Sequence, residues 1–169
     1  MYTDTHARTH LSFIELTPLP ETFREFSFHV WVNLNSMDQD QQLVEMELES
    51  GVKGVWTLIN DGIETRGLLP AFKLGDDTVV GGTPVVPGLW KHIHADLVDG
   101  NLRVSVDAVE VKLPYSAGSS NQKIARWRIG KAMMSNATGL DGLVDGFHIG
   151  PATAAQTPSL TPYIHTHRL

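Results

Sequence analysis

Three glutamates at alternate positions are the first residues whose spacing could do chemistry. In the segment LVEMELES, Glu45, Glu47 and Glu49 alternate with apolar residues, so a strand would place their carboxylates on one face. Retaining glycoside hydrolysis uses two carboxylates about 5–5.5 Å apart, and Glu45 and Glu49 could approach that spacing with suitable rotamers. An acidic strand face is more often simply solvated, and we favour that interpretation. A small glycoside hydrolase that uses Glu45 and Glu49 is the alternative.

A second candidate lies on the segment FSFHVWVNL, whose polar face carries His29, Trp31 and Asn33. An indole among polar groups offers a platform on which a sugar ring can stack. Packing of this indole under loops is the favoured alternative. No residue is assigned a catalytic role, and the candidate ligand-binding residues are His29, Trp31, Glu45, Glu47 and Glu49.

Six of the eight histidines occur in pairs, at His6 and His10, His92 and His94, and His165 and His167. If the two ends of the chain lay together, four terminal imidazoles would suit zinc or nickel. Tails rich in Thr and His are more often polar surface segments. The metal content therefore stays unknown, and no cofactor is assigned.

The elements that position these side chains are expected to be β-strands. Period-two alternation recurs along the chain, whereas helical periodicity is nearly absent. Pro70 predicts an edge strand or a bulge, and residues 37–42 could hold one helical turn. About ten strands at this close spacing are typical of an all-β sandwich or barrel. The main segments are residues 26–34, 43–50, 54–61, 68–74, 92–97, 102–107, 125–130 and 142–150.

The clearest hairpin lies in the segment GLWKHIHADLVDGNLRVSVDAVEV, where Asp99-Gly100-Asn101 separates two alternating runs. Each run has one apolar face, as an antiparallel sheet with one buried side requires. The core is expected to contain Phe28, Val30, Ile93, Ala95, Val104 and Val106.

Four segments in this order resemble the laminin G-like and concanavalin A-like lectin family of jelly rolls. FSFHVWVNLN resembles an early strand of that family, the hairpin above resembles its Trp-led hairpins, and RWRIG and GLDGLVDGFHIG resemble its later strands. The resemblance covers residues 23–150 and implies a two-sheet antiparallel β-sandwich. Ala108 stands where the family usually has Gly, and Gly146 and His148 replace its usual charged residues.

The resemblance also bears on the candidate sites. Related glucanases carry a Glu-x-Asp-x-Glu strand, whereas the middle residue here is Glu47 and the strand lies earlier in the chain. Family members often bind calcium at a rim of the sandwich through Asp carboxylates and backbone carbonyls. Asp141 and Asp145 occupy the nearest matching segment, so calcium is left open and unassigned.

Composition narrows the function classes. The chain of 169 residues suggests one domain, and the absence of cysteine excludes disulfides and thiolate metal sites. The formal charge of −6 disfavours nonspecific nucleic-acid binding. Residues 25–52 contain acids but no Lys or Arg, and residues 111–140 show the reverse. We expect two solvated strand faces, with head-to-tail contact between copies as the alternative.

The tails suggest a larger assembly. We divide the chain into an N-terminal arm with a first strand (1–22), the sandwich (23–150) and an extended, proline-containing C-terminal arm (151–169). We expect Tyr163, Ile164 and Leu169 to anchor residues 156–169 on another chain. No secretory signal or membrane span is recognised.

The expected function is thus a non-catalytic recognition and structural module in a homo-oligomer or capsid-like assembly. A virion decoration or fibre protein that binds glycans and is released by lysis is the favoured example. A free carbohydrate-binding lectin domain is the main alternative, and no nucleic acid or membrane insertion is expected.

Overall fold

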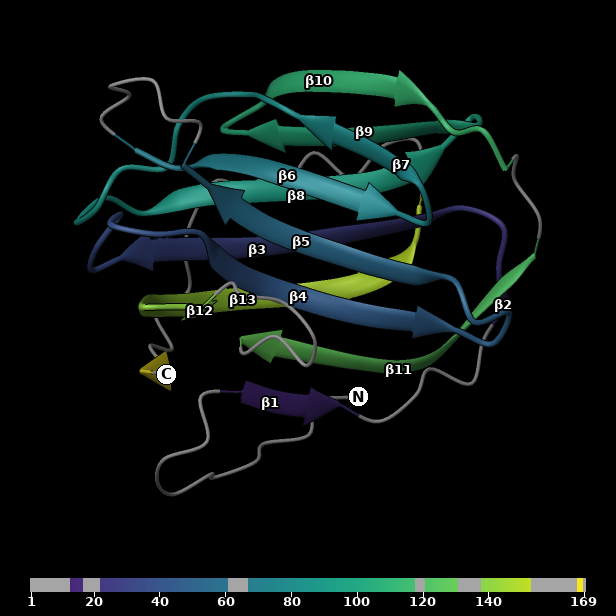
Figure 1. The fold of residues 1–169 in the computed structure, drawn as a ribbon, viewed down its shortest axis with the longest axis horizontal. Helices are drawn as coiled ribbons and strands as arrows, with labels where there is room; N and C mark the ends of the chain where they lie inside the picture. The colour runs from purple at the N-terminus through teal and green to yellow at the C-terminus, as the bar shows by residue number, and fades with distance from the viewer. Residues whose placement is uncertain are drawn as a thin grey trace.

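A computed structural model describes residues 13–16, 22–60, 67–117, 121–130, 138–152 and 167–168. Two sheets pack face to face as a β-sandwich (Figure 1), which confirms the all-β jelly-roll prediction. Nearly all strand pairs are antiparallel, and the short β12–β4 pair is parallel. Within the described ranges, the structure contains no helix with the length and hydropathy needed to cross a membrane.

One sheet has six strands in the order β10-β9-β8-β3-β13-β14. Its strands are β3 (Phe26–Leu34), β8 (Lys91–Val98), β9 (Asn101–Val106), β10 (Val109–Pro114), β13 (Gly142–Pro151) and β14 (His167–Arg168). The second sheet has eight strands, with β1-β11-β4-β5-β6-β7 as its path, β12 beside β4 and β2 beside β11. Its strands are β1 (Phe13–Leu16), β2 (Thr22–Phe23), β4 (Gln41–Leu48), β5 (Lys53–Ile59), β6 (Leu69–Leu74), β7 (Asp77–Val80), β11 (Gln122–Gly130) and β12 (Thr138–Gly139).

The core lies between the sheets and is filled by alternate residues of each long strand. Trp56 stacks on Phe28 and on Phe72, with ring centroids 4.4 and 4.2 Å apart. Burial of such aromatic and aliphatic surface is the main favourable term in folding. All six predicted core residues are fully buried: Phe28, Val30, Ile93, Ala95, Val104 and Val106.

Two tight turns organise the strands β8, β9 and β10. Asp99 and Gly100 join β8 to β9 with φ of +50° and +68°, and Asp107 and Ala108 join β9 to β10 with φ of +48° and +69°. Positive φ at both central residues matches the twist of a two-residue hairpin. Ala108 therefore adopts a conformation that costs an L-residue roughly 1–2 kcal/mol.

Several finer predictions are wrong. Residues 37–42 contain a bend at residues 38 and 39 and the start of β4, and no helical turn. Pro70 lies in β6, an interior strand between β5 and β7, and neither at an edge nor at a bulge. Its position is still explicable, because β6 pairs with β7 only from Ala71 onward, so no ladder bond to β7 is lost at Pro70.

The chain ends return to the sandwich where they are described. β1 pairs with β11, and β14 pairs with β13 through Leu143 opposite Arg168 and Val144 opposite His167. The expectation that the whole segment 156–169 leaves its own sandwich is therefore wrong for residues 167–168. The predicted anchors Tyr163, Ile164 and Leu169 lie outside the described residues.

Candidate functional site

The predicted ligand-binding residues divide between two opposite surfaces. His29 and Trp31 lie on β3 of the six-stranded sheet, whereas Glu45 and Glu47 lie on β4 of the eight-stranded sheet. Their strand neighbours Val30 and Met46 are buried in the core, so both sets face outward. The packed core separates the two sets, and they form two candidate sites.

The first surface carries a row of imidazoles across three strands. In the sheet register, His148 of β13 lies opposite His29 of β3, which lies opposite His94 of β8. The rings of His29 and His94 are stacked with centroids 4.1 Å apart and planes 10° apart. The centroid of His148 is 6.0 Å from that of His29. Although it points outward, His29 is only 7% exposed.

Trp31 stands beside this row. It lies opposite His92 of β8, with ring centroids 5.1 Å apart. On its other side β13 is irregular between Asp145 and His148, and a Cβ atom on Gly146 would come within 3.2 Å of Trp31 Cδ1. The irregularity and the glycine together leave room for the indole, which stays half-buried. Trp31 thus packs on neighbours while keeping part of its surface accessible.

A carboxylate and a guanidinium border the imidazoles on the side away from Trp31. Asp96 lies opposite Arg103 in the β8–β9 register, with Arg103 Nε 3.6 Å from Asp96 Oδ1. Asp96 Oδ2 is 3.3 Å from His94 Nε2. We call Trp31, His92, His29, His94, His148, Asp96 and Arg103 the histidine–tryptophan face.

Burial controls the charge of this face. It lowers the pKa of His29 to about 3 and that of His94 to about 4, with neighbouring histidines adding to both effects. Burial also lowers the pKa of His92. Desolvation raises the pKa of Asp96 to about 6, although Arg103 acts in the opposite direction. At neutral pH the three imidazoles are therefore uncharged, and each offers one N–H donor and one acceptor.

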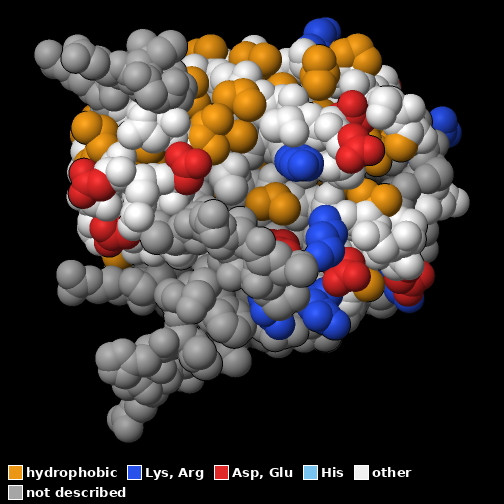
Figure 2. Space-filling view, in the orientation of Figure 1, with side chains coloured by type: hydrophobic (Ala, Val, Ile, Leu, Met, Phe, Trp, Pro, Cys, Tyr) orange, Lys and Arg blue, Asp and Glu red, His pale blue; other side chains and the backbone are white. Residues whose placement is uncertain are grey.

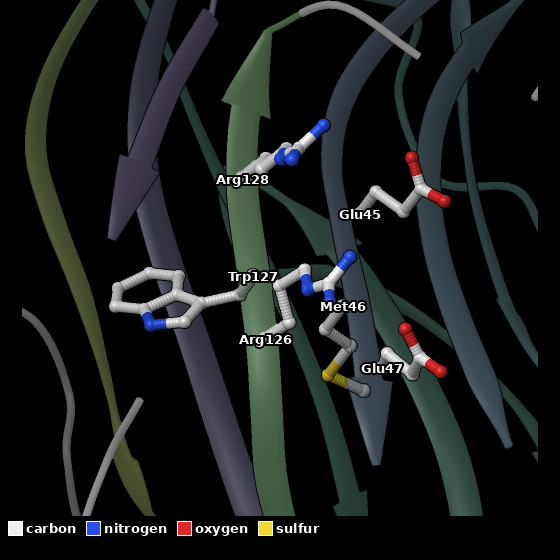
Figure 3. A pocket seen from close by; sticks show the side chains of 6 residues that line it. All are labelled: Glu45, Met46, Glu47, Arg126, Trp127 and Arg128. Carbon is white, nitrogen blue, oxygen red and sulfur yellow. The ribbon is translucent and has the colours of Figure 1, made fainter. Parts of the chain in front are cut away.

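The second surface pairs acids with bases. Glu45 lies opposite Arg128 and Glu47 opposite Arg126 in the β4–β11 register. These four side chains border a small pocket, and Trp127 points away from them (Figure 3). On this face of the molecule, acidic and basic side chains lie close to one another (Figure 2). The glutamates of β4 and the arginines of β11, which belong to the acidic and basic segments of the sequence, are thus neighbours within one sheet.

Glu49 does not share the strand with the other two glutamates. β4 ends at Leu48, and the Glu49 carboxylate forms an ion pair with Lys123, with Oε1 and Nζ 2.7 Å apart. The expected row of three carboxylates on one strand is therefore wrong. The pair that the hydrolase alternative requires, Glu45 and Glu49, has one member beyond the end of the strand.

The two aspartates of the segment for which calcium was left open both accept hydrogen bonds within the protein. The Asp141 carboxylate accepts hydrogen bonds from Asn35 Nδ2 at 2.9 Å and Ser36 Oγ at 2.7 Å, and these bonds lower its pKa. Asp145 Oδ1 accepts from the backbone N–H of Gly146 at 2.7 Å. Among the described residues, no three His, Asp or Glu side chains are grouped so as to hold a metal ion. His6, His10 and His165 lie outside those residues.

The sequence points to four members of the histidine–tryptophan face, His29 and Trp31 on one segment and His92 and His94 on another. Nothing local connects the two segments to each other or to His148. The missing information is that β3 lies between β8 and β13. In the sequence, Asp96 and Arg103 are recognisable only as polar residues that alternate with apolar residues in the hairpin.

Residues 8–156 match the family model described as the concanavalin A-like lectin/glucanases superfamily, of laminin G type. This match confirms the resemblance stated from the sequence. A comparison with curated protein sequences gives no match.

Solved structures with the same fold include a pentraxin, a pair of laminin domains and a putative carbohydrate binding protein. The heptameric SAP-like pentraxin of Limulus polyphemus has a TM-score of 0.63 at 10% identity, over 81% of this chain and 68% of that one. Domains LG4-5 of the mouse laminin alpha1 chain have a TM-score of 0.64 at 9% identity, over 93% and 44%. A putative carbohydrate binding protein from Bacteroides ovatus has a TM-score of 0.60 at 11% identity, over 81% and 40%. The chain thus spans less than half of the last two.

Proposed function

Because the chain belongs to the concanavalin A-like lectin/glucanase superfamily, we propose that it is a non-catalytic glycan-recognition domain. Its sugar lies on the histidine–tryptophan face of the six-stranded sheet. The observation that carries this proposal is the half-buried indole of Trp31 beside His92, in one array with neutral imidazoles and the Asp96–Arg103 pair.

The chemistry of the face suits a sugar. A pyranose presents apolar C–H groups on one side and hydroxyls around its rim. The indole of Trp31 offers a surface for the apolar side. His148 is exposed, His94 and Arg103 are partly exposed, and all three can form hydrogen bonds with hydroxyls. The fold relatives include a putative carbohydrate binding protein, which is in keeping with this assignment.

The non-catalytic assignment is supported by the second surface. Glu45 and Glu47 lie opposite arginines, and Glu49 is paired with Lys123 beyond the end of the strand. Retaining hydrolysis needs one carboxylate free to attack and another able to give a proton, about 5–5.5 Å away. The ion pair of Glu49 does not favour either role.

Binding of labelled protein to a glycan array, followed by calorimetry with the best ligand, tests the proposal. Trp31→Ala should weaken binding about tenfold, since an aromatic contact contributes roughly 0.5–1.5 kcal/mol. Trp31→Phe should retain most of the affinity, and Glu47→Gln on the opposite sheet serves as the control. A protein that binds no glycan, or whose affinity is unchanged in Trp31→Ala, would contradict the proposed site.

The assembly role in a virion decoration or fibre protein stays a prediction, because Tyr163, Ile164 and Leu169 lie outside the described residues. Deletion of residues 156–169 tests it, with the oligomer mass and the melting curve as readouts. Loss of association with an unchanged melting curve supports an assembly arm. Unfolding of the truncated chain would show that the segment serves its own sandwich, as β14 already does.

A further inference from the structure

The strand β10 ends the six-stranded sheet with an uncovered side. Among the described strands it pairs only with β9. Five of its six residues are exposed, and Val109 and Leu113 are 53% and 38% exposed. Hydrophobic side chains gather along the upper part of Figure 2, where Figure 1 places β7 and β10. An uncovered edge strand is a template for pairing with another strand.

This edge is held in place at both ends. The hairpin turn at Asp107 and Ala108 joins it to β9. At the other end, the N–H of Tyr115 donates to the carbonyl of Gly100 at 2.8 Å. The N–H and Oγ of Ser116 donate to Asp77 Oδ2 at 2.8 and 2.6 Å. The strand therefore needs little further ordering before it pairs.

The hairpin determines which backbone groups point outward. In a two-residue hairpin, the residues flanking the turn, Val106 and Val109, form a hydrogen-bonded pair. Since such pairs alternate along the ladder, Val111 and Leu113 also direct their N–H and C=O groups at β9. The N–H and C=O groups of Glu110 and Lys112 point away from the sheet.

The residues Val109-Glu110-Val111-Lys112-Leu113 are self-complementary when paired antiparallel about Val111. Glu110 then lies opposite Lys112 of the partner subunit. The twofold axis generates the equivalent pair between Lys112 and Glu110 of the partner subunit. Val109 lies opposite Leu113 of the partner subunit. We propose that β10 pairs with β10 of a second copy in this register, which makes the protein a closed, twofold-symmetric dimer.

Each feature of the edge supports this partner. The outward backbone groups of Glu110 and Lys112 can exchange hydrogen bonds with those of the second copy, as an antiparallel hydrogen-bonded pair requires. Glu110 Oε2 lies 4.0 Å from Arg103 Nη1 of its own chain, and Lys112 of the partner subunit would add a second cation beside this carboxylate. Pro114 has no N–H, and the pairing ends there. An interface that matches itself closes at two copies.

The dimer also has a functional consequence. Antiparallel pairing of two edge strands joins the two six-stranded sheets into one continuous sheet. The twofold axis is perpendicular to that sheet, so both histidine–tryptophan faces lie on the same side. Two sites with a common orientation can engage one multivalent surface and gain avidity. The dimer itself does not depend on glycan binding.

A single introduced cysteine tests the register, because the chain has none of its own. Val111→Cys would face its symmetry mate in a non-hydrogen-bonded pair, where Cα atoms are about 4.5 Å apart and a disulfide can form. Val109→Cys is the matched control on the same strand. Its symmetry mate is on the order of 13 Å away, beyond disulfide reach.

Sedimentation equilibrium of the unmodified full chain should give the mass of a dimer. On oxidation, Val111→Cys should become a covalent dimer, whereas Val109→Cys should stay largely uncrosslinked. A monomer mass at the highest soluble concentration would overturn the proposal. Equal crosslinking of both variants would overturn the register and with it the proposed pairing.

A charge exchange provides a second, independent test. Lys112→Glu places like charges opposite each other at both symmetric pairs and should raise the dimer dissociation constant about tenfold or more. The double variant Glu110→Lys with Lys112→Glu restores opposite charges and should recover most of the affinity. Lys73→Glu, on β6 of the other sheet, is the control for net charge. With circular dichroism confirming folding, a dimer unaffected by Lys112→Glu would contradict the proposal.

Discussion

The rings of His29 and His94 stack across β3 and β8 with their centroids 4.1 Å apart. Both rings lie in one row with His148, and the centroid of His92 is 5.6 Å from that of His29. Two parallel imidazoles can stack at this distance without charge repulsion when both are uncharged. Protonation of both would place two positive charges side by side in a partly desolvated site.

Acid should therefore destabilise the fold. The pKa of His29 is lowered from 6.5 to about 3 and that of His94 to about 4 in the folded state. Between these values and 6.5 the unfolded chain binds more protons, so the free energy of unfolding falls as the pH falls through that range. Asp96, whose folded pKa is raised to about 6, opposes part of this effect. Urea unfolding at pH 7, 5.5 and 4.5 measures the slope.

The contribution of the stack can be isolated with variants. His29→Gln and His94→Gln should each reduce the loss of stability between pH 7 and 4.5, since each removes one group that binds a proton only on unfolding. Glu47→Gln on the other sheet is a control for a general change in polar surface. A slope unchanged in both histidine variants would show that the acid sensitivity arises elsewhere.

The turn at Ala108 should be improved by glycine. Ala108 has φ of +69°, whereas glycine adopts positive φ without a Cβ clash. Ala108→Gly should raise the free energy of unfolding by about 1 kcal/mol, after allowance for the extra entropy of glycine in the unfolded chain. Thermal and urea unfolding measure the gain.

Gly100 gives the reverse substitution in the preceding turn. It has φ of +68°, and no atom lies within 4 Å of the position of an added Cβ. Gly100→Ala should therefore cost about 1 kcal/mol through backbone strain alone. Equal stability of both variants and the unmodified protein would show that these turns relax away from positive φ.

The orientation of the central hairpin is tested at Val104. This residue is fully buried, and Val104→Asp introduces an unpaired buried charge, which costs several kcal/mol. The variant should be unfolded by far-ultraviolet circular dichroism at room temperature. Val80→Asp is the control, since Val80 is 40% exposed and its replacement should change stability little. Normal melting of Val104→Asp would mean that the hairpin faces are inverted.

The acidic surface is expected to have no role in catalysis. Glu45→Gln and Glu49→Gln should leave glycan binding unchanged, because Glu45 lies on β4 of the sheet opposite the histidine–tryptophan face and Glu49 directly follows that strand. A screen of polysaccharides and oligosaccharides for released reducing ends measures hydrolysis directly. Robust hydrolysis that disappears in both variants would overturn the non-catalytic assignment and identify the two carboxylates as the catalytic pair.

The long strands, their buried faces and the family were predictable from the sequence. Alternation with a period of two requires apolar residues such as Phe28, Val30 and Val104 to lie on one side of a sheet, whichever strands are its neighbours. Turn residues such as Asp99 and Gly100 act locally, so their positions are readable in the same way. The prediction that Pro70 marks an edge strand or a bulge was wrong. Whether a proline interrupts the pairing of β6 depends on how far the neighbouring strand β7 extends along it.

Which polar residues meet depends on the order of the strands in the folded protein. His148 and His29 lie far apart in sequence and face each other because β13 pairs with β3, and Glu45 meets Arg128 because β11 pairs with β4. Strand order arises from long-range packing of the two sheets, which no local pattern encodes. The same holds for β10, whose residues alternate like those of an interior strand but lie at the end of the sheet. The candidate site and the proposed interface both follow from that order, since a sheet brings side chains together across strands and not along them.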